Sequence, residues 1–309
     1  MKKIFIDGSA GTTGLRVFER LAGRNDLQPI ILPESERKDR AARARALNEA
    51  DIAILCLPDE AAREAVSLIE NPETVVLDTS TAHRTAPGWA YGFPELSARH
   101  EAAILTSKRI AVPGCHASGF IALTAPLTAA GIIPGGTLLS CFSITGYSGG
   151  GKKMIAEYEA LPLSAALQAP RLYALGQAHK HLPEMAVQSG LPAPVFCPVV
   201  GNFYSGMQVT VPLFTSQCAP GTTMEKIAEV YRKTYTGQVV SFSEKLDDNG
   251  FLSAVSMAGK DSMQVGITGN EERMLLIAVY DNLGKGASGA AFECLNIVLG
   301  TDPTAGLCL

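Results

Sequence analysis

Short segments that are apolar throughout alternate with segments of helical spacing over the first 80 residues. Strands are predicted at residues 3–7, 30–32, 51–57 and 74–78, and helices at 13–21, 37–50 and 60–69. A strand without polar alternation is typical of a sheet that is buried on both faces, as parallel sheets are. The alternation of the two patterns therefore predicts an α/β domain with a doubly wound, Rossmann-type parallel sheet.

The pattern changes from about residue 137. Longer strands are predicted at 138–144, 195–200, 207–214 and 275–279, and the helices between them are few, chiefly 154–160 and 223–234. This arrangement favours an α+β second domain with a mostly antiparallel sheet. An apolar helix at 287–299 is suited to burial in the first domain. We therefore expect a first domain of residues 1–115, completed by 285–309, and a second of residues 116–284.

Composition narrows the class of protein. The chain has 309 residues, which at about 150 residues per domain suggests two domains, and 47% apolar residues exclude general disorder. A net charge of −4 gives no basic surface for nucleic acid or an anionic membrane. No signal-peptide pattern and no apolar run of about 20 residues is present. The seven cysteines lack the clustered spacing of disulfide frameworks or zinc sites, so we expect a soluble cytoplasmic protein without metal.

A glycine-rich turn follows the first predicted strand and opens a helix. Gly8, Gly11 and Gly14 have the spacing G-x-x-G-x-x-G, a variant of the dinucleotide fingerprint. Without side chains, the backbone N–H groups approach a pyrophosphate at the positive end of the helix. The predicted cofactor loop also includes Ser9, Thr12 and Thr13, although an ordinary glycine-rich turn is the alternative.

The residues after the second predicted strand bear on the choice of nicotinamide cofactor. Glu34 lies 34 − 14 = 20 residues after Gly14, where an acid usually binds the adenosine ribose and favours NAD. Ser35, Arg37 and Lys38 follow and are suited to a 2′-phosphate, with each charge-assisted bond contributing about 1.5–3 kcal/mol. The alternative interpretation is that Arg37 and Lys38 are solvent-exposed charges at the start of a helix. The sequence favours NADP.

Residues 146–152 fit the first part of a phosphate-binding P-loop, G-x-x-x-x-G-K, but Lys153 stands where that loop has Ser or Thr. Because the missing hydroxyl would bind Mg²⁺, the segment is not a P-loop. An anion cradle of backbone amides remains open as a hypothesis.

Cys115 lies between a short predicted strand and an apolar helix. The positive end of a helix dipole favours a thiolate, although a buried structural cysteine fits the spacing equally well. His116 is its neighbour, but adjacent side chains on a helix do not face each other, so we do not expect it to act on Cys115.

Two further histidines, His179 and His181, precede Pro183 and Glu184. No additional ligands accompany them, so an acid or base role is favoured over metal binding. Pro183 favours extended backbone ahead of it, and a helix beginning there would bring Glu184 near His181. We therefore expect His181 to be the main acid/base and His179 to position substrate or nicotinamide.

The motifs occur in an order that resembles one enzyme family. They are the glycine loop and residues 78–84 (DTSTAHR), 91–95 (YGFPE), 113–115 (PGC), 148–152 (SGGGK), 179–184 (HKHLPE) and 281–287 (DNLGKGA). Together they resemble the N-acetyl-gamma-glutamyl-phosphate reductases, particularly the shorter form, and more broadly the aspartate-semialdehyde dehydrogenases. The chain departs from many members at His116, where they have an aromatic residue.

The resemblance implies that a thiolate of Cys115 attacks an acyl phosphate and that NADPH reduces the resulting thioester. It also implies a homo-oligomer acting on a small-molecule substrate in arginine biosynthesis. His181 or His179 would move the proton. Resemblance and side-chain chemistry together assign phosphate binding to Arg84, with Ser148 and Lys152 as weaker candidates, the nicotinamide amide to Asn282, and orienting roles to Tyr173 and Glu184.

Two other interpretations of the function remain open. An aspartate-semialdehyde-type enzyme is expected to have an arginine-rich substrate helix, which we do not find. A non-catalytic NADP-binding protein that senses redox state through Cys115 is the second. The sequence also leaves open whether the substrate is free or linked to a carrier.

Overall fold

The computed structural model describes residues 1–309 and contains two sheets, each in its own unit. The first unit comprises residues 1–94, 98–114 and 290–307, and the second comprises 95–97, 115–289 and 308–309. The chain therefore passes from one unit to the other between Gly114 and Cys115 and returns at residue 290.

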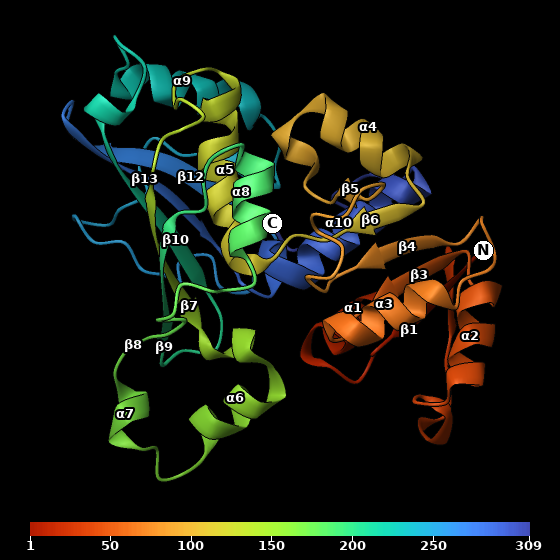
Figure 1. The fold of residues 1–309 in the computed structure, drawn as a ribbon. Helices are drawn as coiled ribbons and strands as arrows, with labels where there is room; N and C mark the ends of the chain where they lie inside the picture. The colour runs from red at the N-terminus through yellow and green to blue at the C-terminus, as the bar shows by residue number, and fades with distance from the viewer. The chain divides into compact units, whose positions relative to one another are not determined.

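The first unit has a six-stranded parallel sheet in the order β2-β1-β3-β4-β6-β5 (Figure 1). Its strands are β1 Lys2–Asp7, β2 Leu27–Ile30, β3 Ile52–Leu55, β4 Val75–Asp78, β5 Ala90–Tyr91 and β6 Arg109–Ala111. Its α-helices are α1 Thr12–Leu21, α2 Arg40–Glu49, α3 Asp59–Ser67, α4 Ala98–Thr106 and α10 Gly289–Leu299, and η1 Glu34–Glu36 is a single 3-10 turn. A second 3-10 turn, η2 Pro94–Leu96, spans the boundary between the units. The predicted doubly wound sheet is confirmed.

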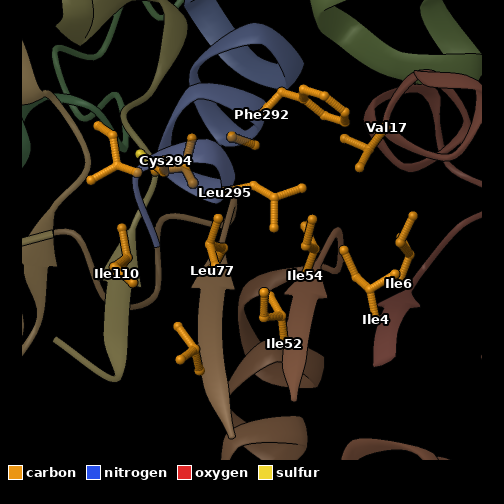
Figure 2. Close-up of a cluster of buried hydrophobic side chains, with 14 of the residues drawn as sticks. Ile4, Ile6, Val17, Ile52, Ile54, Leu77, Ile110, Phe292, Cys294 and Leu295 are labelled. Carbon is orange, nitrogen blue, oxygen red and sulfur yellow. The ribbon is translucent and has the colours of Figure 1, made fainter. Parts of the chain in front are cut away.

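Alternate residues of the buried strands point into two separate hydrophobic cores. Ile4 and Ile6 of β1 pack with α1, α4 and α10, whereas Phe5 packs on the opposite face with α2 and α3. Both faces are thus covered, which explains why these strands are apolar throughout. Figure 2 shows the first core, where Phe292 and Leu295 of α10 lie over the strands.

The second unit has a seven-stranded mixed sheet in the order β11-β12-β13-β10-β7-β9-β8. Its strands are β7 Ser140–Gly146, β8 Arg171–Leu172, β9 Val195–Gly201, β10 Met207–Phe214, β11 Val240–Phe242, β12 Met263–Gly269 and β13 Arg273–Tyr280. Only the pairs β7–β9 and β11–β12 are parallel, and the other four are antiparallel. The sheet is therefore mostly antiparallel, as predicted.

Helices α5 Cys115–Ala129 and α9 Met224–Thr234 pack on one face of this sheet, and α8 Leu182–Ser189 packs against α5. Helices α6 Gly151–Glu159 and α7 Ala165–Gln168 follow β7 and lie beyond the end of the sheet (Figure 1). The remaining short turns are η3 Tyr147–Gly150, η4 Thr215–Gln217 and η5 Gly284–Ser288, of which η5 is a π-turn.

Several elements differ from the predictions, and the short strands β5, β8 and β11 and the helices α4 and α7 were not predicted. The second strand is Leu27–Ile30 rather than 30–32, and it tolerates Pro29 because β2 is an edge strand. Strand β12 was not predicted, since Gly266 and Gly269 interrupt its apolar pattern. The expected helix at 287–299 begins as η5 and continues as α10. No helix has both the length and the apolar character that crossing a lipid bilayer requires.

Candidate active site and cofactor site

The glycine loop after β1 has backbone positions that only glycine can occupy. Gly8 has a φ of +89°, and a β-carbon there would lie 2.3 Å from the carbonyl oxygen of Cys56. A β-carbon at Gly14 would lie 2.4 Å from the carbonyl oxygen of Gly8, which also accepts a hydrogen bond from Gly11. Because the N-cap Gly11 has no side chain to cap α1, the first N–H groups, at Thr12 and Thr13, are oriented for an anion.

A cavity of about 420 Å³ lies beside this loop within the first unit. The structure brings five of the predicted cofactor residues to its lining: Gly8, Ser9, Glu34, Arg37 and Lys38. Ser35 lies in η1 between them, and Gly11, Thr12, Thr13 and Gly14 form the adjoining turn and the start of α1. A glycine cradle at a helix start, opening on a cavity with an acid and two cations, fits a nicotinamide dinucleotide.

The sequence missed two charged residues in this wall, Asp7 and Arg43. Arg43 lies in the predicted helix at 37–50, and its side chain is buried. Its Nε donates to Asp7 at the end of β1 (3.0 Å) and its Nη1 donates to Glu64 (2.8 Å). Burial raises the pKa of Asp7 despite the opposing effect of Arg43. The one sequence signal for its burial is that Arg43 shares a helix face with Ala46, three residues later, in an alanine-rich helix.

A second cavity, of about 200 Å³, lies within the second unit at the start of α5. It brings together the predicted nucleophile, both histidines and the predicted orienting tyrosine. The lining side chains that carry chemistry are Cys115, His116, Tyr173, His179, Lys180 and His181. The segments that supply them are far apart in sequence, so the cavity is a product of the fold.

Cys115 is the first residue of the 15-residue helix α5 and is half-buried. Tyr280 fixes this turn, since its hydroxyl donates to the carbonyl of Cys115 and accepts from the N–H of Gly119 at 3.0 Å. Behind the cysteine, a β-carbon on Gly286 would lie 3.0 Å from the Cys115 β-carbon. The thiol is therefore held at the positive end of a long helix, where a thiolate is favoured.

His179 and His181 lie side by side, with ring centroids 4.7 Å apart. The backbone N–H of His181 donates to Nδ1 of His179 at 3.1 Å, so His179 carries its proton on Nε2. Burial lowers the pKa of His179 to about 4, and the ring is neutral at pH 7. His179 is thus a hydrogen-bond donor to the cavity.

The backbone near His181 differs from one expectation. His181 is the N-cap of α8 and has helical dihedral angles, so the extended geometry inferred from Pro183 is wrong. Proline is tolerated there because the first turn of a helix has no N–H bond to lose. The helix does begin at this point, and its first turn contains Glu184, which is buried.

His116, which the sequence set aside, belongs to the cavity. It is buried, its Nδ1 lies 2.6 Å from the Ser143 hydroxyl, and its Nε2 lies 2.6 Å from the Tyr173 hydroxyl. Burial lowers the pKa of His116 to about 3. His116 contacts Ser143 of β7 and lines the same cavity as Cys115. Only its departure from the family pattern marked it in the sequence.

The other predicted residues occupy two different settings. Asn282 donates from Nδ2 to Ser148 (3.0 Å) and accepts from the N–H of Gly206 (3.0 Å), and both side chains are buried. Lys152 is exposed on α6, although the loop before it lines the cavity through Gly149 and Gly150. Their assigned contacts with substrate and nicotinamide stay predictions.

Arg84 lies in the first unit and is buried. Its Nε donates to the carbonyl of Val112 (2.9 Å) and its Nη2 to that of Thr79 (2.8 Å), the residues that follow β6 and β4. The guanidinium thus joins the carboxyl ends of two neighbouring strands, and its role in binding phosphate stays a prediction.

The chain is similar in sequence and in fold to known proteins. Residues 3–104 match the family described as "Semialdehyde dehydrogenase, NAD binding domain", and residues 115–282 match "Semialdehyde dehydrogenase, dimerisation domain". Among solved structures, aspartate semialdehyde dehydrogenase II of Vibrio cholerae superposes with a TM-score of 0.72 at 18% identity, over 97% of this chain and 98% of that one. This likeness shows the fold.

Relatives with higher sequence identity share the name N-acetyl-gamma-glutamyl-phosphate reductase. The N-acetyl-gamma-glutamyl-phosphate reductase of Sinorhizobium medicae is 45% identical over 96% of this chain and 98% of its own length. That of Trichormus variabilis is 44% identical over 99% of both chains. With this identity over nearly the whole length, and with both semialdehyde dehydrogenase domains present, the chain belongs to the N-acetyl-gamma-glutamyl-phosphate reductase family.

Proposed function

We propose that the protein reduces N-acetyl-L-glutamyl 5-phosphate to N-acetyl-L-glutamate 5-semialdehyde and phosphate, with NADPH, in arginine biosynthesis. The observation that carries the proposal is Cys115 at the start of α5, in one cavity with Tyr173, His179 and His181. A nucleophile at a helix N-terminus with donors and imidazoles around it is suited to acyl transfer through a thioester. The names of the relatives supply the substrate.

In the first step, the sulfur of Cys115 attacks the carbonyl carbon of the acyl phosphate. The bond from that carbon to the phosphate oxygen breaks, phosphate leaves, and a thioester remains on Cys115. The α5 N-terminus favours the thiolate before the attack. Donors that line the cavity, such as Nε2–H of His179, are suited to the negative charge that develops on the carbonyl oxygen.

For the second step, bound NADPH would supply a hydride to the thioester carbon, and the glycine cradle with Arg37 and Lys38 would hold it. His181 then donates a proton to the resulting oxygen and takes it back as the carbon–sulfur bond breaks. The aldehyde leaves and the thiolate of Cys115 is restored. His179 is neutral and keeps its proton on Nε2, so we assign the proton transfer to His181.

The first unit is the proposed NADP site. Its glycine cradle fits a pyrophosphate, and Arg37 and Lys38 in the cavity lining are the candidates for the 2′-phosphate. Glu34 lies in the same lining and is the residue that would favour NAD. Asp7 and Arg43 also line the cavity but pair with each other, so Arg37 and Lys38 against Glu34 favour NADP.

We also propose a homo-oligomer formed through the open face of the second sheet. The helix α5 lies on the face of Val209, whereas Phe142, Val195, Phe214 and Leu275 share the opposite face by register. All four are large apolar side chains that are exposed. A face of this kind is typical of a covered interface, and sedimentation should give a dimer or larger assembly that Phe142→Lys converts to monomer.

The function is tested by mixing enzyme with the semialdehyde, NADP and phosphate and following NADPH. Cys115→Ser should abolish turnover and the thioester while leaving NADPH affinity unchanged, and Cys308→Ser, at an exposed cysteine, is the matched control. Near-normal turnover by Cys115→Ser would overturn the mechanism. Preference for aspartate semialdehyde over the N-acetylated substrate would indicate an aspartate-semialdehyde-type activity, and NADPH binding without turnover of either substrate would indicate a sensor.

A further inference from the structure

A chain of three side chains leads from the buried sheet to the reactive cavity. Ser143 of β7 contacts Nδ1 of His116, and Nε2 of His116 contacts the hydroxyl of Tyr173, each at 2.6 Å. Tyr173 lines the same cavity as Cys115, and the charge of the Cys115 thiolate adds to burial in raising the pKa of Tyr173. The phenol is therefore protonated and carries a single O–H.

Two proton arrangements are compatible with these distances. In one, Ser143 donates to Nδ1, His116 donates from Nε2 to the Tyr173 oxygen, and the Tyr173 O–H is left for the cavity. In the other, every donor is reversed: Tyr173 donates to Nε2, and Nδ1–H donates to Ser143. His116 is neutral at pH 7 and has one N–H, so both bonds must run in the same direction.

Burial of Ser143 decides between them. Its side chain has no exposed surface, and its hydroxyl contacts His116 alone. In the reversed arrangement the Ser143 hydrogen would be buried without an acceptor, and leaving a buried donor unsatisfied is costly. In the first arrangement the hydrogens of the Ser143 hydroxyl and of His116 Nε2 are hydrogen-bonded, and the hydrogen of the Tyr173 hydroxyl faces the cavity.

His179 does not compete for the Tyr173 hydrogen. Its Nδ1 accepts from the backbone of His181, so the ring faces the cavity as a donor at Nε2. The Tyr173 hydroxyl, although near this ring, is left to donate to a bound group.

We propose that Ser143 and His116 are positioning residues that aim the O–H of Tyr173 into the cavity, where it donates to the substrate carbonyl oxygen as negative charge develops on it. The role of Tyr173 in catalysis rests on the proposed function. The direction of the hydrogen bonds does not, because it follows from the buried contacts alone.

The direction is tested first, without substrate. Nitrogen NMR of the histidine-labelled protein at pH 7 should show His116 neutral and protonated on Nε2, with the signal assigned by its loss in His116→Gln. A neutral ring protonated on Nδ1, or an imidazolium, would overturn the proposal. In Ser143→Ala the Nδ1 signal should move, because Nδ1 no longer accepts a hydrogen bond, and Ser140→Ala, on the same strand but the opposite face, should leave it unchanged.

The consequence for turnover is tested by kinetics. We expect Tyr173→Phe to lower kcat about 100-fold, and His116→Phe and Ser143→Ala to lower it about tenfold with little change in KM. His116→Gln, whose amide nitrogen reproduces the Nε2 donor, should recover most of the loss. In a Tyr173→Phe background neither His116→Phe nor Ser143→Ala should have a further effect.

Losses that multiply in that background would mean that His116 acts on folding or packing and would overturn the positioning role, as would full activity of His116→Phe. If the wild-type protein does not turn over N-acetylated semialdehyde, the proposed function fails, and the tautomer measurement still decides the direction of the chain.

Discussion

Gly286 lies directly behind Cys115, and a β-carbon on it would stand 3.0 Å from the Cys115 β-carbon and 3.1 Å from the carbonyl oxygen of Asp281. Neither neighbour is the end of a flexible side chain. The first prediction follows: Gly286→Ala should displace the nucleophile and lower kcat by about tenfold or more, since small misplacements of reacting groups are costly. Steady-state kinetics and the rate of Cys115 alkylation would measure both effects.

The control for this variant is Gly237→Ala in the same unit. An added β-carbon there meets nothing within 4 Å, so activity should stay at the wild-type level. Wild-type kcat in Gly286→Ala would mean that η5 moves freely away from Cys115.

The second prediction ranks the two histidines. His181→Ala should lose at least about 100-fold in single-turnover rate, as is typical when a general acid–base group is removed. His179→Ala should lose less, because His179 is a neutral donor whose pKa is lowered to about 4 by burial. His179→Gln keeps a donor near the position of Nε2 and should be the milder of the two His179 variants. A larger loss for His179→Ala than for His181→Ala would reverse the assignment.

The third prediction concerns cofactor choice. Replacing Arg37 and Lys38 with Ala should weaken NADPH by tenfold or more relative to NADH, because each charge-assisted bond to a phosphate contributes about 1.5–3 kcal/mol. Fluorescence titration with both cofactors would measure the ratio. Arg63→Ala, an exposed arginine of α3, is the control. Equal losses for both cofactors would show that the two cations are only surface charge, and Glu34 would then be the better guide.

The fourth prediction concerns stability in acid. Burial lowers the pKa of His116 from 6.5 to about 3. As the pH falls below 6.5 the unfolded chain takes up a proton that native His116 does not, so the stability present above pH 6.5 is lost. Between pH 7 and 5 this costs about 2 kcal/mol.

Urea unfolding of the wild type and His116→Gln at both pH values would measure this cost. The wild type should lose about 2 kcal/mol more than the variant over the same interval. Parallel losses in the two proteins would show that His116 takes up its proton while folded.

The architecture was predictable because strands that are buried on both faces have recognisable apolar sequences. The strands around Ile4, Ile54 and Leu77 are covered on both faces and are therefore apolar throughout. The glycine loop was predictable for a different reason, since Gly8 and Gly14 approach backbone carbonyls so closely that no other residue fits. In both cases a single local constraint fixes the residue type.

The site was less predictable where its side-chain contacts join residues that are far apart in the sequence. The contact of His116 with Ser143 and Tyr173 joins α5, β7 and a loop, and no spacing rule relates residues 27 and 57 positions apart. The same holds for Arg43, whose burial depends on two carboxylates from other elements. Rules for neighbours on one helix identified the residue types but not their partners.

The return of the chain to the first unit at residue 290 has a consequence for its synthesis. Phe292 and Leu295 fill the core beneath the parallel sheet, and Asn296 accepts a hydrogen bond from Arg24 at 2.6 Å. A ribosome that has made the first 114 residues has thus produced a sheet with one face covered only in part, by α1 and α4. Residues 115–289 emerge before α10 completes that face, so we expect the nascent first unit to be prone to aggregation until then.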